Sequence, residues 1–271
     1  IMHEELSGVR IMAYTTIDDP SAHHQTDLFT GDGSGQSLTF DGNSDLQPDW
    51  IWGSLRDEDG GARFMFDSSR GATKRVKTNL DTEEQTRSGV TTFDTDGYAM
   101  GSHTDSNKSS EPIVVWGWKA NGGTTTTNDA SATSVGDTDS VYQVNSTAKF
   151  SIVSWTGSGS GTVSIAHGLG STPKFLIIKQ RDGANSWLVY HHKNTVVDDA
   201  HDTFLKLHLT NASSADQNNY FMNNTAPTST VATFGSGTEA NASGTYIGYF
   251  FDEVQGYSKF GSYTGNGNAD G

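Results

Sequence analysis

The segment Thr30-Gly31-Asp32-Gly33 sets the organisation of the chain, because it recurs as Thr156-Gly157-Ser158-Gly159 and again as Thr264-Gly265-Asn266-Gly267. The first copy lies between the apolar pair Leu28-Phe29 and the alternating run Ser37-Leu38-Thr39-Phe40. Two glycines one residue apart behind such a segment are typical of a strand that ends in a turn with positive φ. Three copies at domain-sized spacing predict a tandem array whose third unit is truncated.

Other segments repeat in the same order. The repeated residues are mostly aromatic or β-branched, which favours strands, and no charged or nucleophilic residue of evident catalytic character recurs with them. The duplication therefore indicates a repeated scaffold. The matched pairs are Pro48-Asp49-Trp50-Ile51-Trp52 with Pro173-Lys174-Phe175-Leu176-Ile177, Phe64-Met65-Phe66-Asp67 with Leu188-Val189-Tyr190-His191, Asn107-Lys108-Ser109 with Asn241-Ala242-Ser243, and Ile113-Val114-Val115-Trp116 with Ile247-Gly248-Tyr249-Phe250.

Composition predicts an all-β fold. The 271 residues include 31 glycines and 10% aromatic residues, which is typical of short strands joined by many turns. No long stretch shows apolar residues recurring every three to four positions, so we expect almost no helix. We therefore predict tandem antiparallel β-sandwich domains.

Charge and cysteine content exclude several classes of protein. The net charge of −15 disfavours binding to nucleic acid and to anionic membrane surfaces. No segment approaches the roughly 20 apolar residues of a membrane span, so we predict no membrane insertion. The absence of cysteine removes disulfides, thiol catalysis and thiolate metal sites.

The repeats divide the chain into five parts. Residues 1–26 are interpreted as an N-terminal arm, residues 27–120 as the first β-sandwich and residues 150–256 as the second. Residues 121–149 are rich in Thr, Gly and Ser and poor in large apolar residues, so they are interpreted as a linker. Residues 257–271 are interpreted as the start of a third repeat or as a strand that docks on a neighbour.

Several strings resemble a repeat found in virion proteins of marine bacteriophages, and the similarity extends from about Thr15 onward. In the first unit they are Gln47-Pro48-Asp49-Trp50, Asp67-Ser68-Ser69-Arg70-Gly71-Ala72-Thr73-Lys74, Phe93-Asp94-Thr95-Asp96-Gly97-Tyr98 and Trp116-Gly117-Trp118-Lys119-Ala120. In the second unit Phe150-Ser151-Ile152-Val153-Ser154, His167-Gly168-Leu169-Gly170 and Val254-Gln255-Gly256-Tyr257-Ser258-Lys259-Phe260 are similar to its companion repeat.

The resemblance implies a lectin-like, jelly-roll β-sandwich of concanavalin type in a tail, fibre or decoration protein. It implies that the protein is made in the cytoplasm of the bacterial host and lies on the surface of the phage particle, where it aids attachment to the host. Expected partners are other virion proteins, copies of the same chain and host cell-surface glycans. A carbohydrate-active hydrolase of the same fold and a purely structural decoration or joining protein are the alternatives.

No catalytic constellation is evident, so we predict a protein that is not an enzyme and that has no cofactor. A glucanase of this fold needs paired carboxylates at alternating positions of a strand, whereas the nearest cluster, Asp57-Glu58-Asp59, is consecutive. Gly157-Ser158-Gly159-Ser160-Gly161 lacks the order of a nucleophile elbow and is interpreted as a turn.

Metal sites are not predicted either. The adjacent histidines His23-His24 and His191-His192 would face opposite ways on a strand. Asp94, Asp96 and the group Asp198, Asp199 and Asp202 are raw material for a calcium site, but solvated acidic turns are the preferred interpretation.

Aromatic side chains are the remaining candidates for a glycan site, because sugars stack on their faces. We single out Trp187 with His191, and Tyr220-Phe221 with Asn223. In the competing interpretation Trp187 belongs to the core and Tyr220-Phe221 to a strand.

Overall fold

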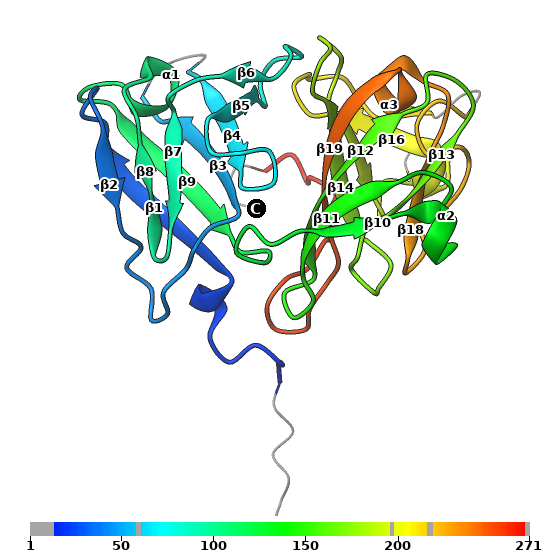
Figure 1. The fold of residues 1–271 in the computed structure, drawn as a ribbon, viewed down its shortest axis with the longest axis horizontal. Coiled ribbons are helices and arrows are strands. Elements are labelled where there is room, and N and C mark those ends of the chain that lie inside the picture. The colour runs from blue at the N-terminus through cyan, green and yellow to red at the C-terminus, as the bar shows by residue number, and fades with distance from the viewer. Residues whose placement is uncertain (1–13, 58–60, 196–197, 216–218, 269–271) are drawn as a thin grey trace, which may run out of the picture.

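A computed structural model describes residues 14–57, 61–195, 198–215 and 219–268. Figure 1 shows two β-sandwiches side by side, the first coloured from blue through cyan to green and the second from green through yellow to orange. The helices in this part of the chain are single turns, so the prediction of an antiparallel all-β sandwich fold is confirmed. None of these helices is long and apolar enough to cross a membrane. The helical turns are η1 (Pro20–Ala22), α1 (Thr104–Asn107), α2 (Ala130–Thr133), η2 (Ala200–Asp202) and α3 (Thr238–Asn241).

The first sandwich packs a six-stranded sheet on a three-stranded sheet, and apolar residues from both fill the space between them. In spatial order the large sheet contains β1 (His24–Thr30), β9 (Pro112–Trp118), β3 (Trp50–Leu55), β4 (Arg63–Asp67), β5 (Lys74–Lys77) and β6 (Gln85–Thr86). The small sheet contains β2 (Gln36–Leu38), β8 (Gly97–Met100) and β7 (Val90–Asp94).

The second sandwich packs an eight-stranded sheet on a two-stranded sheet around a core of its own. The large sheet contains, in spatial order, β10 (Thr126–Asn128), β11 (Ser140–Asn145), β12 (Phe150–Gly157), β19 (Gly244–Phe251), β14 (Phe175–Gln180), β15 (Leu188–His191), β16 (Thr203–Lys206) and β17 (Ser214–Ala215). The small sheet contains β13 (Val163–Ala166) and β18 (Val231–Phe234).

The two sandwiches share a common core topology. The order β1-β9-β3-β4-β5-β6 corresponds strand by strand to β12-β19-β14-β15-β16-β17, and the pair β2-β8 corresponds to β13-β18. The register agrees as well, because Trp50 pairs with Trp118 where Phe175 pairs with Phe251. The predicted duplication of strand order is therefore present in the fold.

One predicted match is wrong by one residue. Leu55 of β3 lies opposite Ile113, and Gln180, its counterpart in β14, lies opposite Tyr246. Ile113 therefore corresponds to Tyr246 and not to Ile247. The correction matters because a shift of one residue moves every side chain of a strand to the other face of the sheet.

The turns after β1 and β12 are built alike. The buried Asn107 Oδ1 accepts a hydrogen bond from Asp32 N at 3.0 Å, and the buried Asn241 Oδ1 accepts one from Ser158 N at 2.8 Å. The first glycine of each turn is also required, because a Cβ on Gly31 would lie 2.1 Å from Lys108 O. A buried asparagine, from α1 in the first sandwich and from α3 in the second, thus holds the turn that the sequence repeats.

The second glycine of the third copy of the turn has the same positive φ as its counterparts in the other two. Gly267 has φ of +74°, close to +74° at Gly33 and +77° at Gly159. Residues 259–268 contain no strand, so the predicted third repeat is represented there by its turn alone.

The interpretation of residues 121–149 as a linker is wrong for much of its length. Within that range β10 and β11 pair with each other, and β11 pairs with β12 along its whole length. Threonine and valine favour this extended edge despite the low apolar content. The segment is therefore part of the second sandwich.

The crossing from the first sandwich to the second is fixed by the buried carboxylate of Asp49. It accepts hydrogen bonds from the backbone N–H groups of Ala120, Gly122 and Gly123 at 2.7–2.8 Å and from Ser68 Oγ at 2.6 Å. A carboxylate with this many donors is well compensated for its burial.

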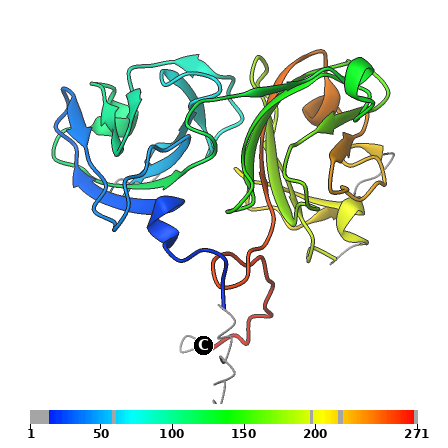
Figure 2. The same cartoon turned by 60° about the horizontal axis from the view of Figure 1, so that its bottom comes forward.

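The two large sheets also pack against each other, outer face to outer face, so the molecule has four layers of sheet. Figure 2 shows the large sheets facing one another, with the segments that lead into β1 and out of β19 on the same side of the molecule. The layer between them is buried and mostly apolar, which makes the pair of sandwiches one packed unit. Its fully buried members are Trp50, Met65 and Val76 from the first sheet and Phe150, Ile152, Ile177, Trp187, Val189, Ile247 and Tyr249 from the second.

A buried ion network crosses the same layer. Arg70 donates to Asp67 and to Glu84, and Glu84 also accepts from Arg181 Nε of the second sandwich at 2.9 Å. Tyr249 Oη donates to Asp67 Oδ2 at 2.6 Å. Burial alone would lower the pKa of Arg70, but the neighbouring Asp67 and Glu84 carboxylates raise it, so the guanidinium stays charged.

Candidate functional site

An aromatic pocket with a volume of about 260 Å³ lies where the two large sheets meet, beside the segment that follows β19. Its walls are apolar, and its lining residues include no Asp, Glu, Lys or Arg. Concave apolar sites with a few polar groups are where proteins commonly bind small ligands. We name this cavity the aromatic pocket; it is lined by His23, His24, Trp50, Trp52, Trp118, Ala148, Phe150, Phe175, Phe251, Tyr257, Ser258 and Phe260.

The duplication builds the centre of the aromatic pocket. His24, Trp118 and Trp50 are direct neighbours on β1, β9 and β3 of the first sheet. Phe150, Phe251 and Phe175 are the corresponding neighbours on β12, β19 and β14 of the second. Each sandwich therefore contributes the same three positions, and the pocket lies between two equivalent surfaces.

Trp50 is at the centre of the ring contacts. Its ring centroid lies 4.4 Å from that of Trp118 and 5.6 Å from that of Phe150, which it stacks upon. Trp118 meets Phe251 edge to face at 6.4 Å. Rings in mutual contact hold one another in place, so the walls of the pocket are preorganised.

Few polar atoms border the pocket, and they are uncharged at neutral pH. Trp50 Nε1 is not among them, because it is fully buried; it has no hydrogen-bond partner among the described residues. His24 Nδ1 lies 2.9 Å from the carbonyl oxygen of Gly117, which can only accept, so Nδ1 carries the proton. Burial lowers the pKa of His24 and of His23, which keeps both rings neutral.

The segment after β19 forms one wall of the pocket. The Phe260 ring stacks on Phe175 with centroids 5.4 Å apart. Its backbone N–H donates to Glu253 Oε1 at 3.0 Å, and its carbonyl oxygen lies 2.9 Å from His192 Nε2. The part of residues 257–271 that was expected to dock on a neighbour thus packs on its own chain as far as Phe260.

Trp187 does not form the predicted sugar platform. It is fully buried between the sandwiches, and its Nε1 donates to the carbonyl oxygen of Lys77 at 2.9 Å. The competing interpretation, that Trp187 belongs to the core, is the one the structure supports. His191 is half-buried beside the aromatic pocket, with its ring edge-on to Phe175 and Phe260.

The second predicted platform is only partly available. Tyr220 is half-buried, stacks on Phe204 at 5.8 Å and lines a shallow cavity with Lys206. Phe221 is fully buried, and neither residue lies in a strand, so the strand interpretation is wrong. Asn223 is half-buried with φ of +53° and does not line that cavity.

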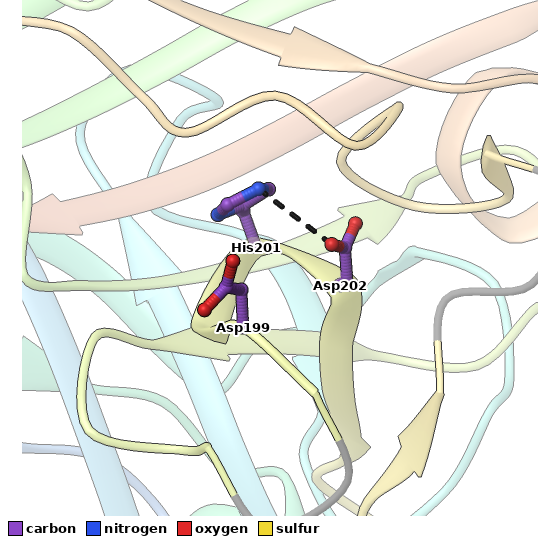
Figure 3. A group of neighbouring side chains, drawn as sticks. All are labelled: Asp199, His201 and Asp202. Carbon is purple, nitrogen blue, oxygen red and sulfur yellow. Dashed lines mark ion pairs between the residues drawn. The ribbon is translucent and has the colours of Figure 1, made fainter.

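The acidic residues near η2 form a small cluster, shown in Figure 3. One ligand atom from each of Asp199, His201 and Asp202 falls within 4.8 Å of the others. His201 Nε2 lies 3.6 Å from Asp202 Oδ2, which accounts for the approach of these two residues without an ion. Asp198, which the sequence placed in this group, instead accepts a hydrogen bond from the Asp199 backbone N–H.

The other acidic and hydroxyl candidates are hydrogen-bonded to neighbouring residues, exposed on the surface, or outside the described residues. Asp96 Oδ1 accepts from Leu46 N at 3.2 Å, and Ser158 Oγ donates to the carbonyl oxygen of Ser160. Asp57 is exposed, and Glu58 and Asp59 lie outside the described residues.

The aromatic pocket was not among the sites predicted from the sequence. The signal was present, because Pro48-Asp49-Trp50 had been matched to Pro173-Lys174-Phe175. What was lacking was the knowledge that the matched aromatic positions face each other, since that depends on how the two sandwiches pack.

Fold and pocket together define a protein of two duplicated β-sandwiches with an aromatic site at their junction. The chain belongs to the family described as Domain of unknown function (DUF7483), whose model matches residues 19–271 and so spans both sandwiches. No curated protein and no solved structure matches the chain.

Proposed function

We propose that this protein is a non-catalytic component of the surface of a bacteriophage particle, in a tail, fibre or decoration assembly, and that it aids attachment by holding a host-surface glycan in the aromatic pocket. The observation that carries the binding role is the pocket itself, formed by equivalent aromatic positions of two sandwiches. The resemblance of the repeated strings to phage virion repeats supports the location.

The chemistry of the pocket favours a neutral saccharide. The C–H face of a sugar ring packs on aromatic rings such as those that line this pocket. The net charge of −15 disfavours acidic sugars and phosphorylated glycans. A volume of about 260 Å³ accommodates one or two sugar rings rather than a long chain.

Binding fits the pocket better than hydrolysis does. Glycoside hydrolysis uses two carboxyl groups on either side of the bond that is cleaved, and the pocket lining contains none. A single site of this kind binds weakly, but many copies on one particle would act together. The partners in this proposal are other virion proteins, further copies of the chain and the glycan.

The test is a titration of the purified full chain with a panel of neutral oligosaccharides, with intrinsic tryptophan fluorescence as the readout. We expect saturable quenching that is lost in Trp118→Ala and in Phe260→Ala. Trp116→Ala is the matched control, because Trp116 lies on β9 outside the pocket lining. Thermal denaturation of each variant separates loss of binding from loss of folding.

Two results would overturn the proposal. Release of reducing sugars by the wild-type chain would favour the hydrolase. No response to any glycan, by the monomeric chain or by a multivalent display of it, would favour a purely structural decoration or joining protein.

A further inference from the structure

The strand β1 lies at the end of its sheet, whereas its counterpart in the second sandwich does not. The order of the first sheet begins β1-β9-β3, and that of the second reads β10-β11-β12-β19-β14. β11 pairs with β12 over all six of its residues, Ser140–Asn145. The duplication therefore shows that this edge of the sandwich accepts another antiparallel strand.

In the first sandwich, the chain before β1 does not take the place of β11. Pro20–Ala22 form the single turn η1, and Asp19 caps it by accepting from Ser21 N at 2.9 Å. The Asp19 carboxylate also accepts from Ser44 Oγ at 2.7 Å, which ties this turn to the loop before β3. Residues 19–22 therefore do not form a strand beside β1.

The backbone of β1 presents alternate residues to the open edge. The carbonyl oxygen of His23 accepts from Lys119 N and Gly31 N donates to the carbonyl oxygen of Glu111, so odd-numbered residues point toward β9. The register has no break between His24 and Thr30. The peptide groups of Thr26 and Leu28 therefore point away from the sheet.

The open edge of β1 is long, apolar in part and uncharged. β1 has seven residues, whereas the other end strands of the two large sheets, β6, β17 and β10, have two, two and three. Leu28 is 63% exposed, and Thr26 and Thr30 are exposed beside it. Natural sheets normally shorten, charge or cover such edges.

We propose that β1 pairs in antiparallel fashion with β1 of a second copy, across a two-fold axis. In the register that sets Leu28 opposite Leu28 of the second copy, Thr26 lies opposite Thr30 and Asp27 lies opposite Phe29, so two chains that each carry a net charge of −15 meet without like charges facing each other. Asp27 is on the other face, where it accepts from Tyr98 Oη at 3.0 Å. Two copies so joined share one continuous twelve-stranded sheet, two times the six strands of one.

The experiment is sedimentation equilibrium of the full chain across a range of concentrations. We expect a reversible dimer for the wild type. Thr26→Pro removes a donor that points to the open edge and leaves the ladder to β9 intact, so we expect at least a tenfold weaker dimer.

A second variant keeps the test decisive if the proline disturbs folding. Leu28→Lys places like charges near each other across the two-fold axis and should also give a monomer. Leu80→Lys is the matched control, because Leu80 is another exposed leucine (40%) away from β1. Its dimer should be as strong as that of the wild type.

Three outcomes would overturn the proposal. They are a wild-type chain that is monomeric at all concentrations, a dimer that survives both β1 variants, and a monomer whose Thr26 and Leu28 amides are protected from hydrogen exchange. The last outcome would mean that the edge is covered by the chain itself.

Discussion

Trp50 of the first sandwich stacks on Tyr249 of the second, with ring centroids 4.6 Å apart and ring planes inclined by 20°. The same Tyr249 donates its hydroxyl proton to Asp67 of the first sandwich. One side chain thus makes both an aromatic and a polar contact across the junction. The family match over both sandwiches agrees with a junction that is integral to the fold.

Removal of the Trp50 ring should uncouple the two sandwiches. Truncation of a fully buried aromatic side chain costs about 3–5 kcal/mol of unfolding free energy. We expect Trp50→Ala to turn one cooperative calorimetric transition into two. Trp116→Ala, at a half-buried position, should lower the melting temperature less and leave a single transition. Equal behaviour of the two variants would contradict a central role for Trp50.

Breaking the buried ion network should lower the free energy of unfolding, because it leaves a buried charge without a partner. Arg70→Met leaves the Asp67 carboxylate buried without its cation, and we expect a loss of about 3–5 kcal/mol in urea denaturation. The double variant Arg70→Met/Asp67→Asn should be more stable than Arg70→Met, because it also removes the unpaired buried charge of Asp67. Lys259→Met breaks an exposed pair with Glu253 and should change stability by less than about 1 kcal/mol.

The two repeated turns should respond alike to loss of the buried asparagine that holds each of them. Asn107→Ala and Asn241→Ala each remove a buried acceptor from a turn N–H group, at an expected cost of about 1–3 kcal/mol. Asn121→Ala, at an exposed position, should stay within about 0.5 kcal/mol of the wild type. A large loss of unfolding free energy in only one of the two variants would show that the two turns share a geometry but do not contribute equally to stability.

His167 should make stability depend on pH. Burial lowers its pKa from 6.5 to about 4, despite the contact of Nε2 with the carbonyl oxygen of Thr228. The unfolded chain takes up a proton near pH 6.5 and the folded chain does not, so this contribution is complete above pH 6.5. It is lost as the pH falls toward 4, by up to about 3 kcal/mol.

The measurement for His167 is the unfolding free energy between pH 6.5 and pH 5, where the lowered pKa of Glu84 keeps that carboxylate ionised. The wild type should lose stability over this interval. His167→Asn should lose less, whatever its absolute stability. Parallel pH profiles for the two proteins would rule out this role for His167.

The strands and their order could be predicted from the sequence where the information is local. The Trp50 strand and the Phe175 strand were matched correctly, and so were Phe66 and Tyr190 on the next strands. In each of these matches the aromatic segment follows directly on its turn, so no insertion or deletion lies between the recognisable turn and the strand. Between Asn241 and β19 the second unit is one residue shorter than the first unit is between Asn107 and β9, and there the predicted register slipped.

By itself the sequence determined the class of fold, the duplication and the repeated turn, because strand propensity and positive φ at glycine act within a few residues. Only the tertiary structure decided that β10 and β11 belong to the second sheet. Their pairing depends on the edge of β12 and on the hydrogen bonds that Asp49 accepts from the backbone at the crossing between the sandwiches. It likewise decided that Trp187 is buried and that Trp50 and Phe175 line one pocket. Which face of a strand meets which partner is a property of long-range packing, and composition and spacing do not encode it.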